Sequence, residues 1–219
     1  MRVLVFDTET TGLPKKRYAK ISDSENWPHI IQLSYVIFDS ETDTITVEGD
    51  HIIKLSDDIE IPESSVKIHG ITREISKTQG ISITRAIGYF MVAYANSDVV
   101  VAHNTQFDKD MINAECYRNK IKLGFQIKPV MSFMDTMKMG KEVCNIRMQH
   151  KLTGEIYIKP PKLTELYQKL FDVDAKNLHN SFIDVLVCLR CYAKLSTLID
   201  RDIYDTCPQL KILLDEYVN

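Results

Sequence analysis

The chain has 219 residues, of which 44% are hydrophobic and 26% are charged, and this composition excludes wholesale disorder and low-complexity repeats. Its length suits one globular domain. Twenty-seven lysines and arginines against 30 aspartates and glutamates give a net charge of −3, which excludes a basic surface over the whole molecule but not local basic patches.

Three predicted strands come first in chain order. Residues 2–6 form a short apolar run typical of a buried strand, and residues 30–38 and 44–55 alternate with enough β-branched side chains to predict two more. Because no helical pattern separates these strands, we expect an antiparallel meander.

Helices and strands then alternate. Ser82 is typical of a helix N-cap, and apolar residues from 83 to 94 recur at helical spacing. The remaining predicted elements are a strand at 99–102, a helix at 107–120, a strand at 129–134, a helix at 162–170 and a buried helix at 181–198. This order predicts an α/β sandwich with a mixed sheet. We expect one domain over residues 1–219, with a core of about 1–195 and a helical tail of about 196–219.

Nothing in the sequence predicts export or membrane insertion. The first apolar run stops at Asp7, too short for a signal-peptide core, and no run approaches the ~18 apolar residues of a membrane span. Five scattered cysteines, an odd number, fit reduced thiols in a reducing compartment. We therefore expect a soluble intracellular protein with no membrane partner, in the cytoplasm or in a eukaryotic nucleus.

Charge is distributed unevenly along the chain. Residues 39–63 carry nine acidic side chains and one basic, whereas residues 138–162 carry six basic and two acidic, and residues 15–20 carry four basic. Such charged segments are as often loops that only face solvent as surfaces that bind a ligand. The two basic segments adjoin the acidic motifs described next, so we expect them to flank a binding groove.

The first acidic motif is Asp7-Thr-Glu-Thr-Thr-Gly-Leu13, at the end of the first predicted strand. Side chains two residues apart on a strand share a face, so Asp7 and Glu9 point the same way. Neighbouring carboxylates repel each other unless a cation lies between them, and oxygen ligands favour Mg²⁺ or Mn²⁺. The alternative is a pair of acids that simply faces water.

The second motif, His103-Asn-Thr-Gln-Phe-Asp108, follows the predicted strand at 99–102. Asp108 lies where a strand leads into a helix, which is a common ligand position in α/β sheets. Asp110 is a competing ligand, further into the helix. The alternative for Asp108 is that it caps the helix.

The third motif, His179-Asn-Ser-Phe-Ile-Asp184, opens the last predicted helix. If this helix begins at Asn180 or Ser181, His179 lies on the preceding loop and Asp184 in the first turn. The alternatives are an ordinary loop histidine and a capping box between Ser181 and Asp184. Each motif lies at a strand end or a helix start, so the three can converge at one edge of the sheet.

Two further patterns are explained by packing. Cys188 and Cys191 lack the second pair that a zinc site requires, so we expect them in the core. Tyr89, Phe90 and Tyr94 could stack on bases, but their helical spacing is more typical of core residues.

In this order, the three motifs resemble those of the DnaQ-like 3′→5′ exonucleases of the DEDDh group, whose sites hold four acids and a histidine. The resemblance covers about residues 1–195, and weaker matches lie between the motifs at 27–32, 69–72, 135–136 and 161–166. The basic stretch 138–159 has no counterpart in the family that we can assign, which leaves the choice of substrate open.

The resemblance implies an RNase H-like three-layer fold, with a mixed five-stranded sheet flanked by helices, and metal-dependent removal of nucleotides from a 3′ end. Two ions, Mg²⁺ or Mn²⁺, would stabilise charge on the attacking and the leaving oxygens. By the family pattern, Asp7 bridges the two ions, and Glu9, Asp108 and Asp184 complete the ligand set. His179 is the expected general base, because imidazole can accept a proton near neutral pH.

The resemblance also implies contacts to the terminal nucleotide of the substrate. The expected contact residues are Thr8, Thr10, Gly12, Leu13, His69, Gly70, Asn104 and Phe107. Glycine in such a position permits close approach of the backbone to the substrate.

We therefore predict a 3′→5′ exonuclease that releases nucleoside 5′-monophosphates. DNA is favoured over RNA, because the first motif is most similar to that of proofreading subunits. The nearest alternative is the same chemistry on RNA, as 3′-end trimming or degradation of short oligomers. A catalytically silent nucleic-acid-binding module is the other, although binding alone would not require four carboxylates. A polymerase or another replication protein is a candidate partner, and residues 39–63 or the C-terminal tail could form the surface on which it docks.

Overall fold

A computed structural model describes the chain except for residues 17, 123–124, 126–131, 177 and 219. Its central element is a five-stranded sheet with the order β3-β2-β1-β4-β5. The strands are β1 (Arg2–Thr10), β2 (Ile30–Asp39), β3 (Thr44–Ile52), β4 (Val99–Ala102) and β5 (Ser132–Asp135). β1 pairs antiparallel with β2 and parallel with β4, which pairs parallel with β5, so the predicted mixed sheet and the meander are confirmed.

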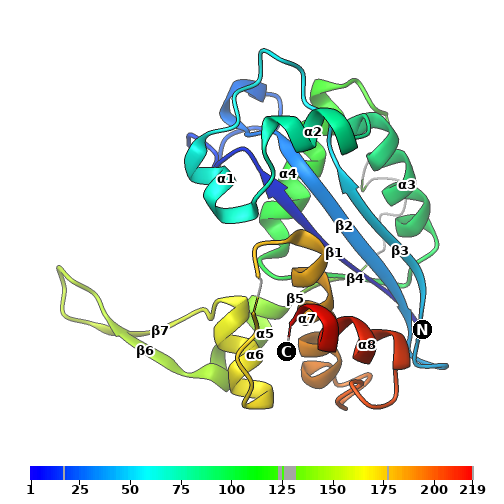
Figure 1. Cartoon of the computed structure of the whole chain (residues 1–219). Coiled ribbons are helices and arrows are strands. Elements are labelled where there is room, and N and C mark those ends of the chain that lie inside the picture. The colour runs from blue at the N-terminus through cyan, green and yellow to red at the C-terminus, as the bar shows by residue number, and fades with distance from the viewer. Residues whose placement is uncertain (17, 123–124, 126–131, 177, 219) are drawn as a thin grey trace.

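Helices cover both faces of this sheet (Figure 1). Leu4 and Phe6 of β1 face a core that includes α3 (Ile83–Ala95) and α4 (Thr105–Arg118). Val3 and Val5 face a second core on the opposite side of the sheet. That core is formed with α6 (Leu163–Phe171), α7 (Ser181–Leu195) and α8 (Pro208–Tyr217). Because β1 is covered on both faces, its sequence is apolar without alternation from Val3 to Phe6.

The first strand is longer than predicted. Pairing with β2 continues to Thr10, with a register shift between Glu9 and Thr10, so Asp7 and Glu9 lie within β1 instead of beyond its end. Polar residues obscure this extension in the sequence, although backbone pairing does not depend on them. The strand predicted at 129–134 lies partly outside the described residues, and its last three residues, 132–134, belong to β5.

Several short elements are missing from the sequence-based prediction. They are α1 (Glu63–His69), α2 (Arg73–Gln79), α5 (Thr136–Cys144), β6 (Ile146–Gln149) and β7 (Ile156–Lys159). With four to nine residues each, they are too short to display a clear period of hydrophobic residues. A three-residue 3₁₀ turn (Ser24–Asn26) also lies between β1 and β2.

The strands β6 and β7 pair with each other antiparallel and form a separate two-stranded sheet. We refer to residues 146–159 as the hairpin. Figure 1 shows that it projects away from the rest of the molecule, beyond α5 and α6. It comprises most of the stretch for which the sequence offered no family counterpart.

The remaining segments are anchored in the second core. Cys188 and Cys191 are buried there, as expected, and all five cysteines are free thiols. The guanidinium of Arg190 donates to both carboxylate oxygens of Asp202, at 2.9 and 2.7 Å, and to the Tyr167 hydroxyl at 2.6 Å. This contact fixes the segment after α7 to the core. Of the helices that the structure describes, none has the length and apolar character required to span a membrane.

Candidate active site

Asp7 and Glu9 share the face of β1 that α7 covers, because they follow Val3 and Val5 at a spacing of two residues. The start of α7 is fastened to this strand. The Ser181 hydroxyl donates to the backbone carbonyl of Asp7 at 2.7 Å, and the Ser181 backbone N–H donates to the side-chain oxygen of Gln32 on β2 at 3.2 Å. These bonds hold the first turn of α7 against the acidic part of β1.

Asp184 is the fourth residue of α7 and is not part of a capping box. Asn180 caps the helix, since its side chain accepts from the backbone N–H of Phe182 at 3.0 Å. The carboxylate of Asp184 is therefore available to the site. Its Oδ2 accepts from the backbone N–H of His179 at 3.3 Å, whereas its Oδ1 is buried without a hydrogen-bond partner.

Asp108 is the fourth residue of α4 and does not cap that helix either. The N-cap is Asn104, which has a left-handed backbone with φ of 72°. Both the backbone N–H and the hydroxyl of Thr8 donate to Asp108 Oδ1, at 3.0 and 2.7 Å. Asp108 is only 2% exposed, and these bonds hold its carboxylate against β1.

Asp110, the competing ligand, lies apart from this group. Its Oδ1 accepts from the side-chain N–H of Gln106 at 2.9 Å, and its side chain lines a separate cavity beside α4.

The four carboxylates form one electrostatic cluster. Burial raises the pKa of Asp7 to about 7. Burial, followed by repulsion from Asp7, Asp184 and Asp108, raises the pKa of Glu9 to about 9. Burial and the charge of Asp7 also raise the pKa values of Asp108 and Asp184. Only nearby charges have such mutual effects, so β1, α4 and α7 bring these acids together.

The donor set fits a divalent cation. One ligand atom each from Glu9, His179 and Asp184 lie within 4.8 Å of one another. The Oδ1 atom of Asp184 is buried without a hydrogen-bond partner, and a cation bound to this carboxylate would supply one and would also reduce the repulsion among the acids. Carboxylate oxygens are the ligands that Mg²⁺ and Mn²⁺ prefer. His179 is exposed on the loop before α7, in a left-handed backbone conformation with φ of 78°.

Two of the predicted substrate contacts have internal partners. The hydroxyl of Thr8 holds Asp108, and the hydroxyl of Thr10 donates to the carbonyl of Gly12 at 2.6 Å. Both side chains are buried. No local sequence pattern indicates that Thr8 positions a carboxylate, because the contact joins residues 100 positions apart.

Three other predicted contacts lie on one surface. Leu13, Asn104 and Phe107 line a cavity of about 430 Å³. Leu13 is 81% exposed, which leaves it available to a ligand.

Two further predicted contacts lie at the end of α1. Gly70 ends that helix with a φ of 76°, a conformation that favours glycine. His69 is buried, its Nδ1 accepts from the backbone N–H of Ile71 at 3.0 Å, and its Nε2 has no hydrogen-bond partner.

An ion pair between half-buried Arg118 and buried Glu115 holds the loop that contributes Trp27 to the 430 Å³ cavity. Arg118 donates to Glu115 at 2.7 Å and to the backbone carbonyls of Ser24 and Trp27 at 3.0 and 2.8 Å. Glu115, 2% exposed, also accepts from the backbone N–H of Ile30 at 3.2 Å. The pair thus clamps the loop that places Trp27 in the cavity wall.

We expect Arg118→Met to loosen this loop. Because buried Glu115 would lose Arg118 and keep only His29, the Asn119 amide and the Ile30 N–H as partners, the free energy of unfolding should fall by about 2 kcal/mol. The KM for an oligonucleotide should rise, while kcat should change little, because the carboxylates stay in place. Urea unfolding and steady-state kinetics measure these effects. Arg85→Met, which removes an exposed arginine of α3, is the control and should change stability by less than about 0.5 kcal/mol.

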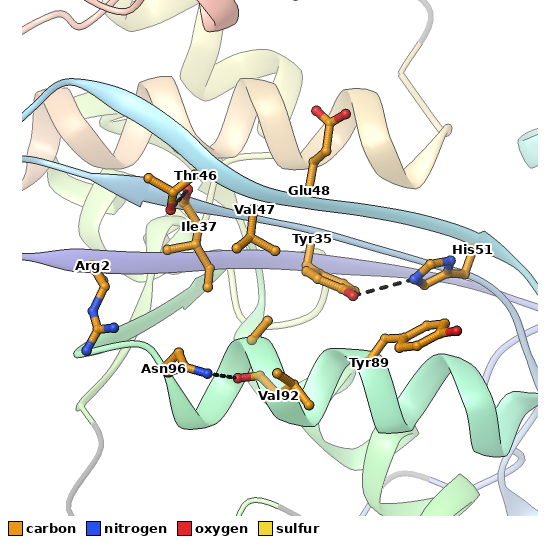
Figure 2. Close-up of a pocket in the computed structure, with 11 residues that line it drawn as sticks. Arg2, Tyr35, Ile37, Thr46, Val47, Glu48, His51, Tyr89, Val92 and Asn96 are labelled. Atoms are coloured by element: carbon orange, nitrogen blue, oxygen red, sulfur yellow. Dashed lines mark hydrogen bonds between the residues drawn. The ribbon is translucent and has the colours of Figure 1, made fainter.

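A larger surface cavity lies elsewhere. Figure 2 shows this groove of about 550 Å³, between β3 and α3, with Tyr35, His51 and Tyr89 along it. It contains none of the predicted site residues. Phe90 and Tyr94 are fully buried, as expected of core residues, whereas Tyr89 is 43% exposed and faces this groove.

Comparison with known proteins places this arrangement among nucleases. A family model, RNase_T, described as exonuclease, matches residues 4–192. The epsilon subunit of DNA polymerase III from Buchnera aphidicola is 27% identical over 144 residues, which are 65% of this chain and 55% of that protein.

Solved structures share the fold. E. coli exonuclease I in complex with a dT13 oligonucleotide is 17% identical, with a TM-score of 0.65 over 88% of this chain and 41% of that one. A product-bound exonuclease I is also 17% identical, with a TM-score of 0.64 over 93% of this chain and 45% of that one. The chain therefore spans about half the length of the relatives that it matches.

Proposed function

The chain belongs to the exonuclease family, and on this premise we propose that it is a metal-dependent 3′→5′ exonuclease that releases nucleoside 5′-monophosphates, with DNA as the preferred substrate. The observation that carries the proposal is the convergence of four acids on one end of β1. They come from β1, α4 and α7; burial raises the pKa values of all four, and the charge of Asp7 further raises those of Glu9, Asp108 and Asp184. A binding module for a polyanion would gain nothing from such a cluster, because carboxylates repel phosphate.

Asp7, Glu9, Asp108 and Asp184 would hold two Mg²⁺ or Mn²⁺ ions. Bound there, the ions would stabilise the charge that develops on the attacking and leaving oxygens of the phosphodiester. Thr8 keeps Asp108 in position, and the bonds of Ser181 keep Asp184 close to Asp7. His179, exposed beside Glu9 and Asp184, takes the proton from the attacking water.

The preference for DNA rests on the relatives. The curated relative is a DNA polymerase subunit, and the exonuclease I structure binds a deoxyoligonucleotide. The relation to a polymerase subunit also supports a polymerase as partner of this chain, for which the acidic segment 39–63 is a candidate surface.

The test is product analysis on matched DNA and RNA strands that carry a 5′ label, with Mg²⁺ or Mn²⁺ present. We expect stepwise shortening from the 3′ end and release of nucleoside 5′-monophosphates, faster on DNA than on RNA. His179→Ala should lower kcat by about 10²- to 10⁴-fold, which is the range for a general base.

His51→Ala is the matched control, because it removes a histidine from the groove of Figure 2, which none of the predicted site residues lines, and it should act like the wild type. Equal rates for His179→Ala and wild type would remove the proposed base. Binding of DNA without metal and without nucleotide release would favour a silent binding module instead.

A further inference from the structure

We propose that the hairpin (residues 146–159) is a second nucleic-acid contact, which grips the strand several nucleotides upstream of the 3′ end. This inference rests on the proposed function and adds an element to it that comes from the part of the chain without an assigned family counterpart. It concerns the hold on long substrates and not the chemistry at the carboxylates.

The hairpin exposes apolar side chains on both of its faces. The register pairs Met148 with Tyr157 on one face and Gln149 with Ile156 on the other. Met148, Tyr157 and Ile156 are 44%, 46% and 72% exposed, and Leu152 near the tip is 92% exposed. Two-stranded hairpins are marginally stable alone, so exposed apolar side chains on both faces indicate a surface that a ligand covers.

The basic side chains of the hairpin indicate an anionic ligand. Arg147 and Lys151 are exposed basic residues, and Glu155 is the only acid within residues 146–159. Cations beside exposed aliphatic and aromatic side chains suit a nucleic-acid strand, since the cations contact phosphates and the flat bases cover the apolar groups. The proposed exonuclease site beside the hairpin already requires a polyanionic substrate.

The base of the hairpin is fastened beside the active site. The ring of His103 lies between the two chain segments that lead into and out of the hairpin. Its Nδ1 is 3.0 Å from the Thr136 hydroxyl at the start of α5, and its Nε2 is 3.1 Å from the Pro161 carbonyl. His103 directly precedes Asn104, the N-cap of the helix that carries Asp108.

A second contact stiffens the same base. The amine of Lys159, at the end of β7, donates to both carboxylate oxygens of Glu165 on α6, at 2.7 and 2.8 Å. The hairpin is therefore a projecting arm with a fixed root, as Figure 1 shows, and not a free loop.

The length of this arm predicts which substrates use it. Six residues from its root to Lys151 span about 20 Å at about 3.3 Å per residue. That length corresponds to about six nucleotides at about 3.4 Å each. Substrates of two or three nucleotides should therefore be too short to benefit, whereas a 20-nucleotide strand should.

The experiment compares wild type with the double variant Arg147→Gln/Lys151→Gln. Three probes are used with Mn²⁺: the p-nitrophenyl ester of thymidine 5′-monophosphate, a thymidine trinucleotide and a 20-nucleotide oligo(dT). We expect about tenfold weaker binding of the 20-mer at 0.1 M salt, with a salt slope smaller by about 1.4 for two lost phosphate contacts. Hydrolysis of the ester and the trinucleotide should be unchanged.

The control variant Lys194→Gln/Lys211→Gln removes the same charge from α7 and α8 and should bind the 20-mer like wild type. A second variant, Leu152→Ser/Ile156→Ser, keeps the charge and removes apolar surface. It should weaken 20-mer binding without altering the salt slope. Retained hydrolysis of the ester demonstrates that each variant is folded.

The possible outcomes separate the two proposals. Unchanged affinity and salt slope in the hairpin variants would overturn the hairpin proposal and leave the exonuclease intact. Equal losses on the ester and the 20-mer would also overturn it. Hairpin-dependent binding of the 20-mer by a wild-type protein that hydrolyses none of the probes would support the hairpin and refute the exonuclease. If the variants instead abolish a dimer seen by sedimentation, while DNA binding persists, the hairpin is a contact between copies of this chain.

Discussion

Asp7→Asn is expected to lower the rate of nucleotide release by about 10³-fold and to raise the melting temperature of the metal-free protein. The loss of rate follows because a metal ligand contributes several kcal/mol of transition-state stabilisation, and about 4 kcal/mol corresponds to about 10³-fold. The gain in stability follows because Asp7 repels Glu9, Asp108 and Asp184, and an amide of the same shape ends that repulsion. Nucleotide release assays and thermal unfolding in a chelator measure the two effects.

The pH dependence of unfolding gives a further check. In the metal-free protein the pKa of Asp7 is raised to about 7 and that of Glu9 to about 9, so the native state binds more protons than the unfolded chain. The stability of wild type is therefore greatest below about pH 4 to 5 with respect to these groups, and it should fall as pH rises toward 9. Asp7→Asn should flatten this decline, and Mn²⁺ should reverse it.

Asp174→Asn is the matched control, because Asp174 is exposed between α6 and α7 and outside the carboxylate cluster. It should change neither the rate nor the melting temperature. A metal-free Asp7→Asn protein that melts below wild type would contradict the inferred repulsion, even if its activity is lost.

Asp202→Ala is expected to lower the free energy of unfolding by about 3 kcal/mol. The variant leaves Arg190, whose side chain is 9% exposed, without the carboxylate that two of its three guanidinium nitrogens contact. The Tyr167 hydroxyl and the ring of Phe171, 4.0 Å from the guanidinium, cannot replace the lost negative charge. Urea unfolding monitored by circular dichroism is the measurement.

Asp205→Ala supplies the control, because Asp205 is 79% exposed and pairs with Lys211 at the surface. It should change stability by less than about 1 kcal/mol. We propose that residues 196–219 belong to the same domain as the carboxylates, because α8 shares a core with α7. A single unfolding transition that shifts as a whole in Asp202→Ala agrees with this, whereas early loss of the tail alone would contradict it.

The sequence predicts the elements that bear the acids better than it predicts what surrounds them. Strands β1 to β4 and helices α3, α4, α6 and α7 follow from apolar runs or from apolar periodicity, because each faces a core. The convergence of Asp108 and Asp184 on Asp7 follows from their places at helix starts beside a common sheet. Their local roles do not, since Asn104 and Asn180 occupy the N-cap positions of the two helices, which leaves the two aspartates to the site.

What the sequence misses depends on contacts between distant residues or on exposed segments. The bonds from Thr8 to Asp108 and from Arg118 to the loop at Trp27 join residues about 90 to 100 positions apart, which no local pattern reports. Because the hairpin lacks a buried face, its strands show no alternation of hydrophobic and polar residues from which they could be predicted.

The two hydrophobic cores on opposite sides of β1 meet at its acidic end, where α4 contributes Asp108 and α7 contributes Asp184. Ions held by these side chains would link α4 and α7, which lie on opposite sides of the sheet. A chelator should then increase amide hydrogen exchange in α4 and in α7 to the same degree, instead of loosening a single loop. The cation that serves the reaction would then also stabilise the packing of both helices against the sheet.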